Sequence, residues 1–355
     1  MPRQFDAIRL QLTAYSLQPM ASLVIQTSFL GDTVLTTPLI ARLAEHGPVD
    51  VLVTPASARL LANHPAIRET IVYDKRGRDR SVAGFARMAR ALRARRYASV
   101  YLAQGSARSG ALALAARIPR RVGFESSAGR AFYTVRVPAP IGMHHAEKLF
   151  TLGSAGGARP YSRDDLRPRL FPGDEERQAV DALLASGADD GRPLVAFAPG
   201  SVWATKRWPH YPALARALGA RARIVVVGGH DDAPLAREIL AATGDAGAVD
   251  ATGRLTLLAS AELIGRARVI VSNDSAPLHL ASAVGTPTVA IFGPTVPAFG
   301  FGPLAARSAI VEDDMLACRP CDRHGPRRCP LGHWKCMLDQ SPARVAGIVT
   351  GYLIP

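Results

Sequence analysis

Three loop segments of this 355-residue chain hold polar side chains that could act together on a substrate. The first is 27–33 (TSFLGDT), where Asp32 follows Gly31 and an apolar helical pattern comes directly after it. An aspartate at the end of a buried strand can take a proton from a substrate hydroxyl. It can equally cap the helix that follows by accepting backbone N–H groups. The residues alone leave both roles open.

The second segment, 198–209 (APGSVWATKRWP), is small, polar and cationic. Ser201 and Thr205 offer hydroxyl groups, and Lys206 offers a compact ammonium of the kind that binds phosphate. Lys206 is the single lysine between residues 149 and 334 in a chain that otherwise uses arginine. The pattern is suggestive of an anion-binding lysine, although a solvated surface lysine fits the segment about equally well.

The third segment, 268–279 (RVIVSNDSAPLH), ends an apolar run at Asp274, Ser275 and Ala276 and places His279 on the first turn of a helix. A helix N-terminus presents free N–H groups and the positive end of the macrodipole, which suits a diphosphate. Capping by Asp274 and Ser275, and core packing of His279, are the alternatives.

Two further features concern a nucleotide and a metal. Asp231 and Asp232 follow another apolar run, and a carboxylate there can hold ribose hydroxyls. The chain has no Asp-x-Asp, so a Mg²⁺ ion bridging to a diphosphate has no obvious ligands, and we expect no cofactor. The spacing C-x₂-C-x₇-C-x₆-C, with two histidines inside it, is compatible with a structural metal or with free thiols. The residues concerned are Cys318, Cys321, Cys329 and Cys336, with His324 and His333.

A repeating strand and helix pattern positions these segments. Apolar runs predict buried strands at 22–26, 49–55, 69–74 and 98–104, and again at 193–199, 223–229, 268–274 and 287–294. Helical patterns lie between them. Fully apolar strands alternating with helices predict parallel sheets covered on both faces. Ligands of such sheets bind at the carboxyl ends of the strands, so two domains that face each other form a cleft.

The predicted fold class is therefore α/β, with two doubly wound, Rossmann-like domains facing a cleft. A polar interval rich in Gly, Pro and Arg separates the two patterns and marks a linker. We expect an N-terminal extension at 1–21, a first domain at 22–155, the linker at 156–176, a second domain at 177–340 and a C-terminal helix at 341–355.

Positive charge is concentrated in the first half. Residues 1–160 carry 22 Lys+Arg and 9 Asp+Glu, a net charge of +13, whereas the remainder carries 21 and 20, a net charge of +1. This asymmetry indicates an anionic partner for the first half: nucleic acid, an acidic membrane surface or a phosphorylated substrate. No run of 18 apolar residues and no secretory signal are apparent, so we expect a cytoplasmic protein.

Four stretches carry a family resemblance: TSFLGDTVLTTPLI, PGSVWATKRWP, VSNDSAPLHLASAVGTPTVAIFGPT and CRPCDRHGPRRCPLGHWKCM. Together they resemble the bacterial lipopolysaccharide heptosyltransferases of glycosyltransferase family nine, most closely the heptosyltransferase II branch. The resemblance implies a GT-B fold and a metal-independent, inverting transfer of L-glycero-D-manno-heptose from ADP-heptose to the lipopolysaccharide inner core. It implies that the first domain binds a phosphorylated lipid A-Kdo/heptose acceptor at the inner membrane surface, which leaves a peripheral membrane location open.

The resemblance also implies roles for individual residues. Asp32 falls on the general base and Lys206 on the residue that contacts the donor diphosphate. The other expected donor-binding residues are Ser201, Thr205, Asp231 (or Asp232), Asp274, Ser275, Ala276 and His279, with Ala276 standing where many members have glycine. The expected acceptor-binding residues are Gly31, Arg120 and Arg121.

Two alternatives stay open at this point. A family-nine transferase could use another nucleotide sugar. A basic nucleic-acid-binding protein would fit the isoelectric point of 10.4, but the chain has no recognised nucleic-acid-binding motif, so we expect no nucleic acid as partner.

Overall fold

The structure, a computed structural model, describes residues 21–139, 141–154, 160–185, 187, 191–244 and 247–354. Nearly all of the predicted N-terminal extension, and residues 156–159 of the predicted linker, lie outside these ranges.

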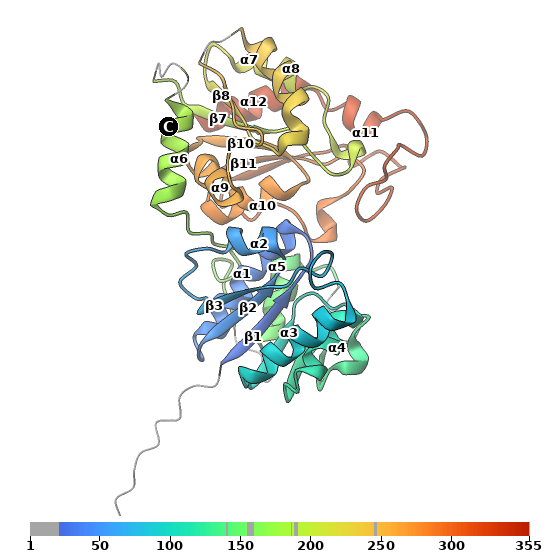
Figure 1. Cartoon of the computed structure of the whole chain (residues 1–355). Helices are drawn as coiled ribbons and strands as arrows, with labels where there is room; N and C mark the ends of the chain where they lie inside the picture. The colour runs from blue at the N-terminus through green and yellow to red at the C-terminus, as the bar shows by residue number, and fades with distance from the viewer. Residues whose placement is uncertain are drawn as a thin grey trace, which may run out of the picture.

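The first domain is a six-stranded parallel sheet with the strand order β3-β2-β1-β4-β5-β6. Figure 1 labels β3, β2 and β1 of this sheet. Its central strands are mostly apolar and are buried on both faces, as is typical of parallel strands, with Asp50 as a buried carboxylate in β2. The strands are β1 (Ser22–Gln26), β2 (Val49–Val53), β3 (Glu69–Val72), β4 (Ser99–Leu102), β5 (Arg120–Phe124) and β6 (Val135–Val137). The helices are α1 (Leu30–Ala44), α2 (Pro55–Leu60), α3 (Val82–Ala94), α4 (Ala107–Ala115), the 3₁₀ helix η1 (Arg130–Phe132) and α5 (His145–Gly153).

The second domain is a parallel sheet of the same size, with the order β12-β11-β10-β7-β8-β9. Its strands are β7 (Leu194–Ala198), β8 (Arg223–Val226), β9 (Val249–Asp250), β10 (Val269–Asn273), β11 (Thr288–Ile291) and β12 (Ser308–Val311). Its helices are α6 (Asp174–Leu184), η2 (Ala204–Lys206), α7 (Tyr211–Leu218), η3 (His230–Asp232), α8 (Ala233–Thr243), α9 (Leu257–Arg266), α10 (Ala276–Val284), η4 (Pro297–Phe299), α11 (Lys335–Leu338) and α12 (Pro342–Leu353).

Both sheets follow one winding rule. If the strands of each domain are numbered along the chain, both sheets have the order 3-2-1-4-5-6, so the first and fourth strands lie side by side at the centre. This is the doubly wound arrangement, in which the connections after the central strands open a crevice at their carboxyl ends. The predicted α/β class with two Rossmann-like domains is thereby confirmed.

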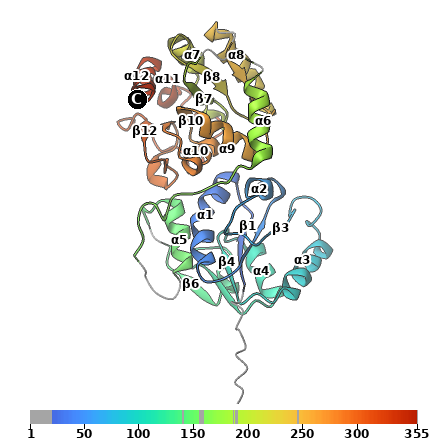
Figure 2. The ribbon, with the colours of Figure 1, turned by 90° about the vertical axis from the view of Figure 1, so that its left-hand side faces the viewer.

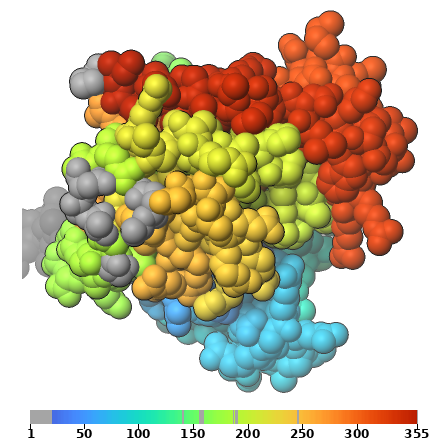
Figure 3. All heavy atoms as spheres, turned by 90° about the horizontal axis from the view of Figure 1, so that it is seen from above, coloured from blue at the N-terminus to red at the C-terminus, as the bar shows by residue number. Residues whose placement is uncertain are grey.

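The two domains are stacked end to end, with α1 of the first beside α10 of the second (Figure 2). One cluster of buried apolar side chains includes Val24 and Leu39 of the first domain together with Ile270 and Leu280 of the second. The C-terminal helix α12 packs on α7 at the outer side of the second domain, where Figure 3 shows it from above. Within the ranges the structure describes, no helix has the length and apolar character needed to cross a bilayer.

Candidate active site

Asp32 lies in the first turn of α1, directly after the loop that leaves the carboxyl end of β1. The N-cap position of α1 is Phe29, so Asp32 is not the capping residue that the sequence left open. The Ser28 hydroxyl donates a hydrogen bond of 2.5 Å to Asp32 Oδ2, and His145 Nε2 lies 3.6 Å from Oδ1. The carboxylate is therefore oriented by side chains and remains 17% exposed to the cleft.

His145 is the first residue of α5, and its imidazole stacks on Phe301 with ring centroids 4.9 Å apart. Burial lowers the pKa of His145 to about 4, an effect that outweighs the opposing influence of the Asp32 carboxylate. The cationic neighbours Lys148 and Arg323 lower this pKa further. His145 is accordingly a neutral imidazole at neutral pH.

Lys206 lies across the cleft from Asp32, in the loop between β7 and α7. Its Nζ donates to Asp274 Oδ2 at 2.6 Å, and the Thr295 hydroxyl donates to the same oxygen at 2.6 Å. Both members of the ion pair are 11% exposed, so the pair is nearly buried and faces the cleft. Asp274 thus holds the ammonium of Lys206 in place.

The N-terminus of α10 provides the floor of the same site. Its second residue, Pro277, has no N–H, and the Leu278 N–H donates to the Ser275 carbonyl at 3.2 Å. The Ala276 N–H, for which the helix supplies no carbonyl, is therefore the first-turn donor that can face a ligand. Ser275 Oγ is buried and has no hydrogen-bond partner among the described residues. His279 is buried, and burial lowers its pKa to about 4. Its ring closes against the first domain at Gly31, where an added methyl group would come within 2.7 Å of His279 Cδ2.

These elements enclose a cleft of about 510 Å³ between the domains. Eight of the residues expected from the sequence line it: Gly31, Asp32, Ser201, Lys206, Asp274, Ser275, Ala276 and His279. The loop after the first strand of one sheet and the loops of the other therefore meet, as the parallel topology requires.

Three of the expected donor-binding residues are placed differently. Thr205 is buried, and its hydroxyl donates to the carbonyl of Pro326, so it anchors the loop that contains the cysteines. Asp231 is exposed on η3 and is not part of the cleft lining. Asp232 accepts the N–H of Gly229 at 2.9 Å and its carboxylate packs over Gly200, which is a capping role.

The two expected acceptor-binding arginines lie at the wrong end of the sheet to reach Asp32. Arg120 pairs in register with Ser99, which pairs with Ser22 at the start of β1, whereas Asp32 follows the end of β1. The Arg121 guanidinium donates to the carbonyls of Ile118 and Phe132 within its own domain. The two arginines and Asp32 therefore lie at opposite edges of the sheet, because parallel strands place their starts and their ends on opposite edges.

Several cleft residues were not found from the sequence. They are Ser28, Phe29, Leu30, His145, Val202, Trp203, Val296, Phe299, Phe301, Arg323 and His324. Arg323 and His324 belong to the cysteine-containing loop, which is joined to the second domain by the bond from Cys321 N–H to the Pro294 carbonyl, 2.9 Å. His324 approaches Phe29 of the first domain, with ring centroids 6.4 Å apart. The loop is thus a wall of the cleft.

The four cysteines of that loop are thiols rather than disulfides. Cys318 Sγ lies 3.8 Å from His333 Nε2, and the Cys321 thiol contacts the carbonyl of Cys318 at 3.3 Å. In the described ranges no group of three or more His, Cys, Asp or Glu side chains is arranged to hold a metal ion.

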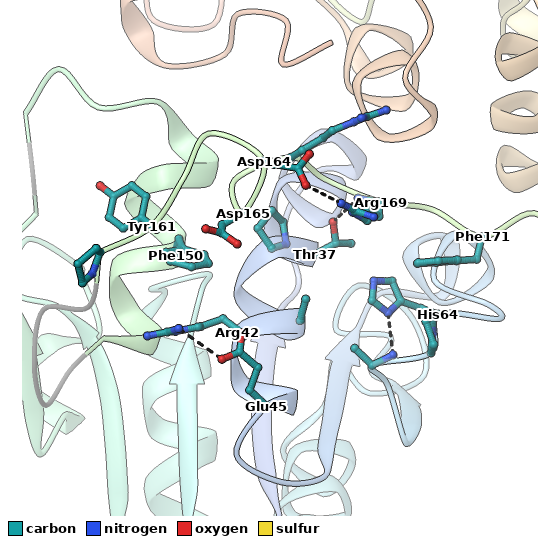
Figure 4. A pocket seen from close by; sticks show the side chains of 16 residues that line it. Thr37, Arg42, Glu45, His64, Phe150, Tyr161, Asp164, Asp165, Arg169 and Phe171 are labelled. Atoms are coloured by element: carbon teal, nitrogen blue, oxygen red, sulfur yellow. Dashed lines mark hydrogen bonds and ion pairs between the residues drawn. The ribbon is translucent and has the colours of Figure 1, made fainter. Parts of the chain in front are cut away.

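A second cavity, of about 350 Å³, is lined by the C-terminal half of α1 (Figure 4). Phe150 of α5 and residues from 64–66 and 160–171 also line it. Two ion pairs line it: Arg42 with Glu45 at 3.4 Å and Arg169 with Asp164 at 3.0 Å. The N–H of Arg169 donates to the hydroxyl of Thr37 at 3.0 Å. These contacts fasten the segment between the domains to the helix that carries Asp32.

A third cavity, of about 560 Å³, lies in the first domain at the carboxyl ends of β1 to β4 and shares Ser28, Phe29 and Leu30 with the cleft. Lys75 Nζ donates to the Thr27 hydroxyl at 3.1 Å, and that hydroxyl donates to Gln104 Oε1 at 3.2 Å. No carboxylate in the described part of the chain pairs with Lys75. Burial lowers the pKa of Lys75, with smaller contributions from Arg76 and Arg108.

Two doubly wound domains that face each other across a cleft form the GT-B fold, which glycosyltransferases use. Residues 85–334 match the family model described as glycosyltransferase family 9 (heptosyltransferase), and the chain belongs to this family.

Known relatives and structures are similar over nearly the whole chain. Lipopolysaccharide heptosyltransferase 2 of Salmonella typhimurium is 28% identical over 92% of this chain and 96% of its own length. The glycosyl transferase family 9 structure from Veillonella parvula superposes with a TM-score of 0.84 at 24% identity, covering 95% and 98% of the two chains. The structure titled E. coli ADP-heptose lps heptosyltransferase II gives 0.78 at 24% identity, covering 94% and 99%. The comparisons favour the transferase over the nucleic-acid-binding alternative.

Proposed function

We propose that the chain transfers heptose from ADP-heptose to the inner core of lipopolysaccharide, with inversion at the anomeric carbon and without a metal ion. The observation that carries the proposal is that Asp32 of one domain faces Lys206 and the α10 N-terminus of the other across a single cleft. A base and an anion-binding site on opposite walls are what direct displacement of a nucleoside diphosphate needs.

In the proposed reaction the acceptor hydroxyl oxygen attacks the anomeric carbon while the bond from that carbon to the diphosphate oxygen breaks. The hydroxyl proton passes to an Asp32 oxygen, and the electron pair of the broken bond leaves with ADP. Ser28 holds Oδ2 of the carboxylate, so Oδ1 is the oxygen presented for the proton.

The charge that develops on the leaving diphosphate would be met by Lys206 and the first turn of α10. Preorganised cations and N–H groups lower the cost of such charge because they need no rearrangement during the reaction. The Ser275 hydroxyl, buried without a partner among the described residues, is a further donor for a phosphate oxygen. The absence of any Asp-x-Asp in the sequence supports a metal-independent leaving group.

Supporting evidence for the donor comes from the comparisons. The E. coli structure of the same fold is named for ADP-heptose, and the Salmonella relative is named a lipopolysaccharide heptosyltransferase. A donor screen tests the sugar: ADP-heptose should support release of ADP in the presence of acceptor, and UDP- and GDP-sugars should not. Efficient transfer from another nucleotide sugar would refute the donor assignment while leaving the family intact.

We also propose that the acceptor enters through the first-domain cavity beside Lys75 and Arg76. That cavity adjoins the Asp32 loop, and Lys75 has no carboxylate partner in the described ranges, so an anionic group of the acceptor can pair with it. The same cavity offers hydroxyl and amide groups for sugar contacts, from Thr27, Thr54 and Gln104.

The variant Lys75→Met should raise the acceptor KM about tenfold, the effect of a lost charge-assisted contact, and leave the ADP-heptose KM nearly unchanged. Salt should weaken acceptor binding less in this variant than in the wild type, because one screened contact is gone. Lys335→Met, at an exposed lysine outside the cleft, is the matched control. An unchanged acceptor KM in Lys75→Met would place the acceptor elsewhere.

A further inference from the structure

The second domain reaches the general base through a short seam of backbone and imidazole contacts. The N–H of His145 donates to the carbonyl of Gly300 at 2.7 Å, and His144 Nε2 lies 3.0 Å from the carbonyl of Gly302. His144 Nδ1 accepts the N–H of Ala146 at 3.2 Å, so the proton of this neutral imidazole must be on Nε2, which donates to Gly302. Burial lowers the pKa of His144, in keeping with the neutral form.

The backbone at Gly300 is shaped for this contact. Its φ of +91° lies in the region that favours glycine, and a Cβ there would lie 2.8 Å from the Met143 carbonyl oxygen. Gly302 is a natural comparison, because the nearest atom to its Cβ would be Pro297 Cβ at 3.7 Å, which is ordinary contact. The seam therefore requires glycine at position 300, whereas at position 302 it uses only the backbone carbonyl.

His145 connects this seam to Asp32. Its ring is stacked on Phe301, with an angle of 28° between the ring planes. Phe301 lies in the sequence between Gly300 and Gly302, whose carbonyls form the seam. Its Nε2 faces Asp32 Oδ1 at 3.6 Å, which is longer than a hydrogen bond but within reach of a small movement. Since the other carboxylate oxygen is already held by Ser28, the imidazole is the remaining group that fixes how the base points.

We infer that His145 is the positioning residue of Asp32, and that Gly300 and Phe301 of the second domain set the position of this imidazole when the two domains are closed. The inference rests on the proposed role of Asp32 as the base. This role requires the neutral tautomer with the proton on Nε2, the nitrogen that faces Oδ1. Such an imidazole directs Oδ1 toward the acceptor hydroxyl without adding a positive charge that would make the carboxylate a weaker base. Asp32 is therefore correctly oriented only when the two domains are closed.

Three substitutions at His145 separate the N–H from the ring. His145→Ala should lower kcat about tenfold or more, the size expected for a lost hydrogen bond, while ADP affinity and both KM values stay within about threefold. His145→Gln keeps an N–H donor and should recover most of the loss. His145→Phe keeps the stacking on Phe301 without the N–H, and its kcat should stay as low as that of the alanine variant.

The seam is tested by two glycine substitutions in one loop. Gly300→Ala should lower kcat in the same way as His145→Ala with ADP affinity retained, whereas Gly302→Ala should behave as the wild type. If Gly300→Ala does not fold, the His145→Phe measurement still decides the matter, because it leaves the backbone unchanged.

The outcomes distinguish this inference from the proposed function. Wild-type kcat in His145→Phe would overturn the role of the N–H, and a loss confined to donor affinity would show that His145 contacts the nucleotide sugar instead. Asp32→Asn is measured beside them: full turnover in that variant would refute the base itself. An inactive Asp32→Asn together with fully active His145 variants would refute only the positioning role.

Discussion

The ion pair between Lys206 and Asp274 makes a quantitative test of the donor site possible. Removing one partner of a fully buried pair costs about 3–5 kcal/mol, because the other charge is left without compensation. Here each side chain keeps 11% exposure and faces the cleft, so we expect about 2–3 kcal/mol for Asp274→Asn. For a domain of this size that is a fall in Tm of about 4–12 °C.

The design is a double-mutant cycle followed by thermal unfolding. Lys206→Met removes the ammonium and keeps much of the aliphatic stem, and the Lys206→Met/Asp274→Asn double variant should lose less stability than the sum of the two. We expect a coupling of about 1–2 kcal/mol, within the range for residues in contact. The exposed pair Arg177 and Asp174, 2.7 Å apart, is the control, and Asp174→Asn should leave Tm nearly unchanged.

Added ADP turns the cycle into a test of function. If the diphosphate pairs with Lys206, it replaces the lost carboxylate, so the Tm deficit of Asp274→Asn should shrink as ADP is added. At saturating ADP the deficit shrinks by the difference in binding free energy between variant and wild type, about 1.4 kcal/mol for each tenfold by which ADP binds Asp274→Asn more tightly. Additive single variants would refute the coupling, and a tenfold weaker affinity for ADP in Asp274→Asn would show that the carboxylate itself binds the donor.

Three further results are expected. Asp32→Asn should lower turnover by about 10²-fold or more with ADP binding intact, as for a lost general base. Retained turnover would refute the assignment of Asp32 as the base. EDTA should leave transfer unchanged; a loss restored by Mg²⁺ or Mn²⁺ would contradict the leaving-group account. Buried His64, whose pKa burial lowers from 6.5 to about 4, should make the fold lose stability as pH falls through that window, because only the unfolded state binds the proton there. His64→Phe should reduce the slope of unfolding free energy against pH by one proton, about 1.4 kcal/mol per pH unit, and an unchanged slope in urea titrations would argue against it.

The strands that sequence reasoning located, apart from β3, are buried along all or nearly all of their length. β1 (SLVIQ) and β10 (VIVSN) are buried along their length and are recognisable without any knowledge of the fold. β5 begins with Arg120 and Arg121, β9 has two residues, and β12 alternates between exposed and half-buried positions at a sheet edge. These strands are formed by pairing with neighbours already in place, and a local pattern does not contain that information.

The same distinction applies to the site. Asp32, Lys206 and Asp274 each follow a strand. The rule that parallel strands end at one edge brings Lys206 to Asp274, and the expectation that two such domains face each other across a cleft brings Asp32 to both. His145 follows no predicted strand, and only the packing of α5 on α1 brings it to Asp32. The pair of adjacent histidines before a helical pattern was the single available signal, and nothing in it pointed to a carboxylate more than a hundred positions earlier.

Charge shows most clearly what a linear count omits. The net charge of +13 in residues 1–160 predicts an anionic partner for the first half, yet it is a sum over both edges of a sheet. Arg120 belongs to the edge where strands start, whereas Lys75 follows the end of β3 and lies beside the Asp32 loop. Register along parallel strands, not the amount of charge, decides which cations can meet an acceptor at the reacting centre. In a series of variants with constant net charge, removing a cation from the edge where the strands end should raise the acceptor KM, whereas removing one from the edge where they start should not. Equal effects at both edges would refute this reasoning.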